Sequence, residues 1–353
     1  MNGRDGGRSA VCVAGLRAVL QEDEGSAAAP AARLRRLIDA GWGELPLPAR
    51  GRTVDRWRAL AEVAGHDLSL AKLYEGHTDA LAILCELRAP AGIAGSTRTS
   101  IWGTWAAEAP GQRVAIRPGP DGGMRLYGDK AWCSGAEHAS HGLLTAWHSG
   151  ADVPQLVAVE MGQPGMRVDC GAWQAVGMAA SASATVSFDG VPATAVGVSG
   201  GYLHRPGFWQ GGAGVAACWH GGTTALGRAL HAAVLRAPAE QRTSFRLAAL
   251  GRVDRYLAGT AGLLRDAAQW IDTHPQADAR MVALRVRQAA EACSHTVLEE
   301  VGRALGATPF CRDAAFARMA ADLPVFIRQS HAARDDAALG ECLVGLEEPP
   351  WTI

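Results

Sequence analysis

The ionisable residues with the most suggestive spacing lie in an apolar stretch before residue 90. Glu75, His77 and Asp79 fall within a little over one helical turn, close to Leu73 and Leu81. Burying such groups without partners would be costly, so they must either face solvent or line a polar site. If they line a site, Glu75 or His77 could act as a general base. A solvent-facing side of the helix explains the pattern equally well.

A second pair that could transfer a proton stands near the C-terminal end of the sequence. His331 precedes Asp335 by four residues, a spacing that places two side chains on one face of a helix. Because an imidazole titrates near neutral pH, His331 could act as a base or proton donor while Asp335 orients its ring. A surface or interhelix contact is the ordinary alternative for such a pair.

Other motifs lack the context that their chemistry needs. Residues 197–201 fit the nucleophile pattern G-x-S-x-G and residues 212–217 fit G-x-G-x-x-A, but neither lies in a strand-turn-helix or βαβ pattern. The eight cysteines are scattered, with no C-x-x-C pair and no metal-like spacing with histidine. The sequence therefore predicts neither a hydrolase nor a metal site.

The elements that must position these residues follow three successive hydrophobic patterns. Apolar residues recur at helical spacing from residue 31 to about 87, whereas β-rich runs separated by Gly, Pro and Asp occupy about 94–198. Helical spacing returns after Gly207 and continues to about Leu339, with breaks near Pro238, Pro275 and Pro309 that would give four long helices. This order of helices, sheet and helices argues against a parallel βαβ sheet.

We therefore expect an α+β multidomain protein. Its expected parts are a helical N-terminal domain (1–93), a middle β-barrel domain (94–204), a C-terminal four-helix bundle (205–345) and a short tail (346–353).

Composition excludes several classes of partner. The chain has 353 residues, 48% of them hydrophobic, which is enough for two or three cores. A net charge of -1 gives no basic field for nucleic acid. No apolar run reaches the length of a membrane span, and the run from Ala10 to Leu20 lacks a clear cleavage site, so we expect a cytoplasmic protein.

Three strings in the middle of the chain resemble, in order, motifs of the acyl-CoA dehydrogenase family. Residues 101–104 read Ile-Trp-Gly-Thr, like the family's flavin-contacting strand that ends in Thr. Residues 128–134 resemble the pattern Gly-x-Lys-x-Trp-Ile-Thr/Ser, and residues 177–192 resemble Gly-Met-Arg-x-Ser followed by Phe-Asp-x-Val-x-Val-Pro. Three ordered matches are much harder to obtain by chance than one. The resemblance extends over roughly residues 31–345.

The resemblance implies that FAD binds against the middle domain. The residues implied to contact it are Trp102, Gly103, Thr104, Trp132, Cys133 and Ser134. The indole of Trp132 offers a flat apolar face to the isoalloxazine ring, and the hydroxyls of Thr104 and Ser134 can bind its polar edge. The alternative is that Trp102 and Trp132 are ordinary core aromatics of a β-domain.

The chain departs from the family pattern at the residues that complete its chemistry. Family dehydrogenases remove a proton from the acyl-CoA with a Glu, and the alignment places Ser330 there; the alternative position falls near Gly212. The Arg-x-x-Phe-Gly segment that reaches the neighbouring subunit's FAD is replaced by residues 235–238, and the turn after Thr104 by residues 105–111. Family branches that act as flavin monooxygenases often carry a His near this Glu position, which favours His331.

Three functions are consistent with the sequence. The first is FAD-dependent oxidation of an acyl-CoA or related acyl substrate, with an electron-transfer flavoprotein as a possible partner. The second is reduced-flavin monooxygenation supported by a flavin reductase, and the third is a non-catalytic scaffold that binds a ligand or partner subunit. The resemblance implies a homodimer or homotetramer.

Overall fold

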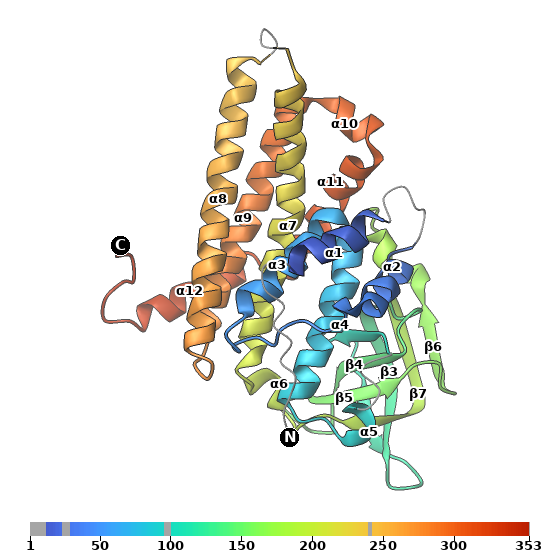
Figure 1. Cartoon of the computed structure of the whole chain (residues 1–353). Coiled ribbons are helices and arrows are strands. Elements are labelled where there is room, and N and C mark those ends of the chain that lie inside the picture. The colour runs from blue at the N-terminus through green and yellow to red at the C-terminus, as the bar shows by residue number, and fades with distance from the viewer. Residues whose placement is uncertain (1–11, 23–28, 95–99, 239–241, 353) are drawn as a thin grey trace.

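The computed structural model describes residues 12–22, 29–94, 100–238 and 242–352. The chain forms helices, then a sheet, then helices, as the sequence predicts (Figure 1). Within the described residues, no helix is both long and apolar enough to cross a bilayer.

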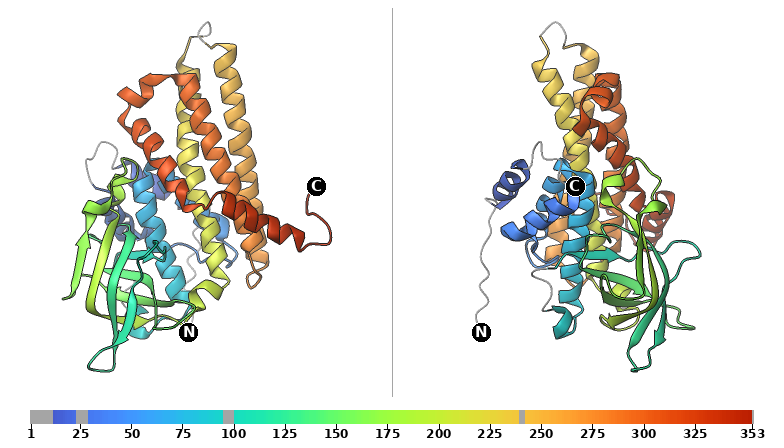
Figure 2. Two further views of the ribbon diagram at one scale, coloured as in Figure 1. Left: turned by 180° about the vertical axis from the view of Figure 1, so that it is seen from behind. Right: turned by 90° about the vertical axis from the view of Figure 1, so that its right-hand side faces the viewer.

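Helices α2 and α3 pack against α4 in the N-terminal part, where five α-helices occur in the described residues. They are α1 (Cys12–Gln21), α2 (Pro30–Leu37), α3 (Thr53–His66), α4 (Leu68–Glu86) and α5 (Ala91–Ala94), with a π-turn at Ile38–Trp42 after α2. The carboxylate of Asp67 begins α4 by accepting a hydrogen bond from the Leu70 amide at 2.9 Å. Helix α4 lies between the sheet and the C-terminal helices (Figures 1 and 2) and is buried along most of its length. Its polar residues must therefore find partners inside the protein.

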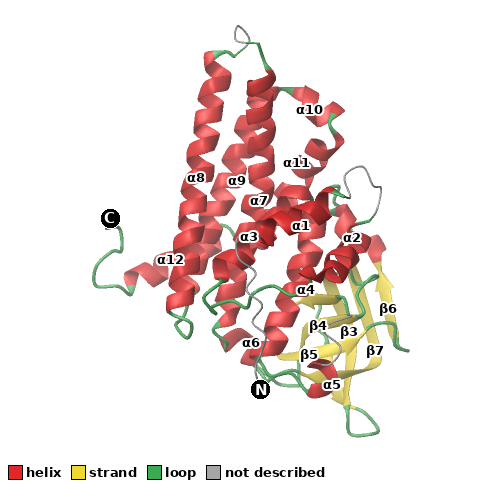
Figure 3. Cartoon of the chain, viewed as in Figure 1, coloured by secondary structure: helices red, strands yellow, loops and turns green. Residues whose placement is uncertain are grey.

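The sheet gathers in one part of the molecule, beside α4 (Figure 3). Its strands are β1 (Trp102–Trp105), β2 (Ala115–Pro118), β3 (Met124–Cys133), β4 (His141–Ala146), β5 (Gln155–Glu160), β6 (Met166–Asp169) and β7 (Ala184–Ala195). The strand order is β1-β4-β5-β7-β3-β2, with β6 also paired to β7, and only β1 and β4 run parallel. A backbone bridge from Ala115 to Trp147 curls the sheet into a barrel-like shape around an apolar core.

Three long helices form the main body of the C-terminal part. The helices after the sheet are α6 (Gly201–His204), α7 (Gly207–Arg236), α8 (Ser244–Thr273), α9 (Arg280–Leu305), α10 (Ala307–Arg312), α11 (Ala314–Phe326) and α12 (Ala333–Val344). Helices α7, α8 and α9 pack side by side, and α11 packs against α7 and α4 (Figure 1). The large core cluster joins these helices to the N-terminal ones.

The expected fourth long helix is divided. Gly306 ends α9 at a φ of 66°, and the carboxylate of Asp313 then begins α11 by accepting from the amides of Ala315 and Phe316. Helix α11 ends in a 3-10 turn at residues 327–329, and Ala332, with a φ of 48°, redirects the chain into α12. After this break α12 packs against α9, and His331 lies outside a helix.

Candidate functional site

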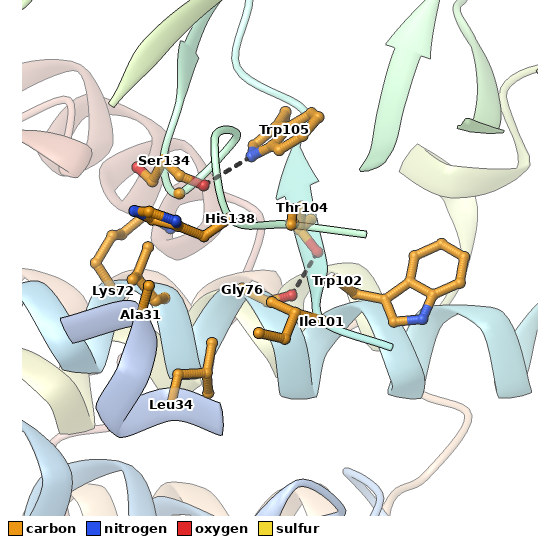
Figure 4. A pocket seen from close by; sticks show the side chains of 14 residues that line it. Ala31, Leu34, Lys72, Gly76, Ile101, Trp102, Thr104, Trp105, Ser134 and His138 are labelled. Atoms are coloured by element: carbon orange, nitrogen blue, oxygen red, sulfur yellow. Dashed lines mark hydrogen bonds between the residues drawn. The ribbon is translucent and has the colours of Figure 1, made fainter. Parts of the chain in front are cut away.

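A small pocket lies where α2, α4, β1 and the segment after β3 meet (Figure 4). It is lined by Ala31, Leu34, Lys72, Leu73, Gly76, Ile101, Trp102, Gly103, Thr104, Trp105, Ser134, Gly135, His138 and Ala139. The cavity volume is about 10 Å³, which is room for about one water molecule. A tricyclic ring therefore does not fit inside it in this conformation, in which α2 closes one side. Such a ring would have to lie across the adjoining surface.

Trp132 stands two residues before Ser134, which lines the pocket. Strand β3 changes register between Lys130 and Cys133, and within this bulge Trp132 adopts a φ of 58°. Non-glycine residues rarely adopt this conformation, which costs about 1–3 kcal/mol and is found mainly at active sites and ligand-binding sites. Trp132 is 51% exposed, whereas Lys130 and Cys133 on either side are buried. The bulge thus presents a large indole to solvent, as a platform for a flat ring requires.

Lys130 holds one side of this bulge in place. Its ammonium donates to a carboxylate oxygen of Glu108 at 2.9 Å and to the Thr145 hydroxyl at 2.7 Å. Burial lowers the pKa of Lys130, and the Glu108 carboxylate opposes that change. The contact also ties β3 to the loop that follows β1, so the segments that contain Thr104 and Trp132 are fixed to each other.

Two of the six predicted cofactor residues turn their side chains into the protein. The indole of Trp102 is buried and stacks on the ring of His141, with centroids 4.6 Å apart. The thiol of Cys133 donates to the Lys130 carbonyl at 3.2 Å, and burial raises its pKa to about 12. Both side chains belong to the core, so these residues could meet a ligand only through their backbone.

Gly103 is required by packing. A Cβ atom there would lie 2.4 Å from the ring of Trp105. The Trp105 indole fills this space and donates to the Ser134 carbonyl at 3.1 Å, which joins β1 to the segment after β3.

Thr104 and Ser134, the two residues with predicted hydroxyl contacts, both line the pocket (Figure 4). Thr104 donates its hydroxyl to the Gly76 carbonyl of α4 at 2.7 Å. The Ser134 hydroxyl lies 2.8 Å from that of Ser183, which approaches the Ser181 hydroxyl at 3.0 Å. An exposed indole two residues from Ser134, together with two fixed hydroxyls at the pocket, fits the chemistry of an isoalloxazine ring with an apolar body and a polar edge.

Glu75 is buried beside the pocket but does not line it. Its carboxylate accepts from the Lys72 ammonium at 2.7 Å, and Lys72 does line the pocket. Burial raises the pKa of Glu75, whereas Lys72 opposes that rise. The solvent-facing interpretation of this helix is therefore wrong for Glu75. Any part that Glu75 plays in the pocket passes through Lys72.

The His77 side chain joins two elements of the fold by a hydrogen bond. Its Nδ1 accepts the Trp102 amide at 3.2 Å and so connects α4 to the start of β1. Burial, with a smaller contribution from Arg35, lowers the pKa of His77 to about 4. The imidazole is neutral at physiological pH, and it does not line the pocket.

His331 and Asp335 meet, although not on one helical face as the spacing predicts. His331 precedes α12, and Asp335 in the first turn accepts from the His331 amide at 3.1 Å. The imidazole Nδ1 lies 3.2 Å from the same carboxylate, and the His331 side chain is 61% exposed. Neither residue lines the pocket. Ser330 is buried nearby and accepts from the side-chain amide of Gln288 at 2.9 Å.

Sequence reasoning missed Arg287 of α9, which lies near Asp335. Its buried guanidinium donates to the carbonyls of Gly212 and Gln329 at 2.9 and 2.7 Å and approaches the Asp335 carboxylate at 4.0 Å. Burial lowers the pKa of Arg287, while Asp335 and Glu75 oppose that change. A cation at an apolar face position of α9 was the available signal.

Comparisons with known proteins agree on the fold. No family model and no curated protein matches the chain. Methanesulfinate monooxygenase MsuC from Pseudomonas fluorescens has a TM-score of 0.79 at 18% identity, covering 96% of this chain and 97% of that one. Dibenzothiophene monooxygenase TdsC from Paenibacillus sp. A11-2 has a TM-score of 0.74 at 20% identity, covering 92% and 93%; TdsC structures include FMN-bound and indole-bound ones.

A dehydrogenase matches equally well. Butyryl-CoA dehydrogenase from Megasphaera elsdenii has a TM-score of 0.78 at 15% identity, covering 93% of this chain and 97% of that one. Enzymes of two reaction classes therefore share this arrangement of helices and sheet. The chain has the fold of the acyl-CoA dehydrogenases.

Proposed function

We propose that this chain is a flavin-dependent oxidoreductase whose flavin lies against Trp132, beside the hydroxyls of Thr104 and Ser134. The half-exposed indole on a strained bulge carries this proposal, because a buried core tryptophan would need neither feature. The TdsC structures with FMN support it by analogy of fold. The same observation weighs against a scaffold that has lost its ligand site.

The chain's residues have distinct parts in this proposal. A bound flavin would supply hydride acceptance or oxygen activation, chemistry that side chains lack. Trp132 would stack on the ring, while Thr104 and Ser134 would orient its polar edge. Helix α2 would limit access of water from one side of the pocket.

The residue at the position that the resemblance assigns to the base favours monooxygenation over acyl-CoA oxidation. Removal of a proton next to a thioester carbonyl needs a base of suitable strength within reach. The position that the resemblance assigns to that base holds Ser330, whose hydroxyl is engaged with Gln288. We therefore place reduced-flavin monooxygenation, with a flavin reductase as partner, ahead of oxidation of an acyl thioester.

FAD remains the cofactor that the resemblance implies, and FMN is the alternative. The two share the isoalloxazine ring that Trp132 would contact, so the site described above does not discriminate between them. Titrating the protein with each flavin, and following flavin fluorescence and visible absorbance, measures how much the adenylate half of FAD adds to the affinity. Failure of the protein to bind either flavin would refute the proposed function.

Two assays then separate the reactions. With bound oxidised flavin under anaerobic conditions, bleaching by a panel of acyl-CoAs would establish dehydrogenation and contradict our preference. With a flavin reductase and oxygen, substrate-dependent oxygen incorporation would support monooxygenation. His331→Ala tests the remaining base hypothesis, because turnover equal to that of the unaltered protein would remove His331 from the mechanism.

A further inference from the structure

A second and larger cavity lies where α1, α3 and α7 meet; these helices are labelled in Figure 1. Its volume is about 410 Å³, and small organic ligands typically occupy sites of about 300–1,000 Å³. The residues that line it come from all three helices, and none of them lines the pocket beside β1. The cavity is therefore a separate candidate binding site.

The floor of this cavity is a close contact between α3 and α7. Gly221 is buried there, and a Cβ atom on it would lie 2.2 Å from the Ala61 carbonyl oxygen. Gly65, about one turn further along α3, comes similarly close to the Gly221 carbonyl. The small side chains at this contact leave space above it, whereas Arg58 and Arg228 are exposed and stand at the rim. The backbone below the cavity is thus packed and cannot shift easily.

The carboxylate that lines the cavity already has a partner. Arg17 of α1 donates to both oxygens of Glu62 of α3, at 2.7 and 2.8 Å. Arg17 and, to a smaller extent, Arg228 lower the pKa of Glu62, so this side chain stays ionised and bound to Arg17. Arg228 itself forms no ion pair or hydrogen bond with a described residue. Its positive charge is left for a ligand.

Arg58 is only partly neutralised. It approaches the Asp55 carboxylate at 3.2 Å, and Arg52 approaches the other oxygen of that carboxylate at 3.0 Å. Two guanidiniums therefore share one negative charge. Together with the unpaired Arg228, this leaves an excess of two positive charges around the rim.

The remaining polar groups in the cavity carry no charge. Burial lowers the pKa of His220 to about 4, and Arg265 contributes to the same change, so the imidazole is neutral at physiological pH. Its Nε2 lies 3.5 Å from the Thr224 hydroxyl, and both side chains line the cavity. They add hydrogen-bonding groups without adding a negative charge that would repel an anion.

Two guanidinium charges above a small uncharged floor suit a doubly charged anion with a compact organic part. Guanidinium forks match the oxygens of phosphate, and a phosphate monoester carries nearly two negative charges at neutral pH, whereas a carboxylate carries one. We propose that this cavity binds a small phosphate monoester, with its phosphate held by Arg58 and Arg228 and its organic part over Ala61 and Gly221. The proposal is independent of the flavin, because the two sites share no residue.

Calorimetric titration of the whole protein with phenyl phosphate tests this assignment. In a phosphate-free buffer of low ionic strength, we expect a Kd below about 1 mM. Benzoate should bind at least about tenfold more weakly because it carries one charge. Inorganic phosphate should also bind more weakly than phenyl phosphate because it has no apolar part to cover the floor.

Three variants locate the binding. Arg58→Gln and Arg228→Gln each remove one rim charge and should each weaken phenyl phosphate at least about tenfold. Both side chains are exposed, so unaltered urea midpoints should show that the variants fold normally. Arg236→Gln is the matched control, because Arg236 is an exposed arginine of α7 that does not line the cavity. Its Kd should equal that of the unaltered protein.

Several results would overturn the proposal. A Kd above about 10 mM for phenyl phosphate, or a Kd unchanged in Arg58→Gln and Arg228→Gln, would show that the cavity does not bind this ligand. Equal weakening in Arg236→Gln would show a general effect of net charge instead of a site. Benzoate or inorganic phosphate binding as tightly as phenyl phosphate would contradict the assigned class of ligand.

Discussion

His77 makes the stability of the protein depend on pH in a way that one substitution can isolate. Its buried Nδ1 accepts the Trp102 amide, which joins α4 to the strand that lines the pocket. A protonated ring could not accept this hydrogen bond, and its charge would lie in the core. His77→Asn retains an acceptor at this position and removes the titrating group.

The magnitude follows from the pKa, which burial lowers from 6.5 to about 4. Between these values the unfolded chain binds a proton at His77 and the folded chain does not, so the free energy of unfolding rises with pH. The slope approaches about 1.36 kcal/mol per pH unit. Because the slope is only about half of this value at pH 6.5, His77 alone should remove about 1.5 kcal/mol of stability as the pH falls from about 6.5 to about 5.

Urea unfolding at several pH values in this window gives the slope for each variant. We expect His77→Asn to have a slope lower than that of the unaltered protein by about one bound proton. His220, whose pKa is also lowered to about 4 by burial, contributes equally to both and cancels. Replacing the exposed His148 with Asn is the control and should leave the slope unchanged. A slope in His77→Asn equal to the original would refute the assignment of His77 as a buried, neutral acceptor.

Two further predictions concern packing and charge. Gly177→Ala places a Cβ atom 2.2 Å from the Ala321 carbonyl oxygen and should lower the free energy of unfolding in urea by at least about 1–3 kcal/mol. Gly251→Ala on α8 is the control, because its Cβ meets no atom within 4 Å, and it should raise that free energy by about 0.5–1 kcal/mol. Equal effects would show that the loop at residue 177 moves to make room for the Cβ. Lys130→Met should destabilise by about 1 kcal/mol, because the Glu108 carboxylate loses its cationic partner and keeps only its contacts with Thr145 and Trp147. Adding Glu108→Gln should restore part of that loss. Additive losses in the double variant would contradict this coupling.

The order of elements could be predicted because it follows from the hydrophobic period. The β-rich runs in the middle of the chain form strands, and the segments with helical spacing on either side form helices. The break before α12 could not be predicted in the same way. Ala332 adopts a φ of 48° there, and nothing in its side chain distinguishes it from an alanine inside a helix.

The candidate site was predictable only in part, because its partners are far apart in sequence. Trp132, Thr104 and Ser134 stood in recognisable strings, but the contact of the Ser134 hydroxyl with Ser183 depends on the pairing of Cys133 with Ala184 across β3 and β7. That register brings Ser183 to Ser134, and a single sequence does not reveal it. The exposure of Trp132 likewise results from a bulge, which carries no composition signal of its own.

The central claim is that a flavin lies against Trp132, and the dissociation constant of Trp132→Ala tests it most directly. We expect flavin to bind this variant at least about tenfold more weakly than the unaltered protein, because loss of the ring removes both apolar area and an aromatic stacking contact. Trp351→Ala, which removes another exposed indole in the tail, should bind flavin normally. Equal affinity of all three proteins for flavin would contradict the claim.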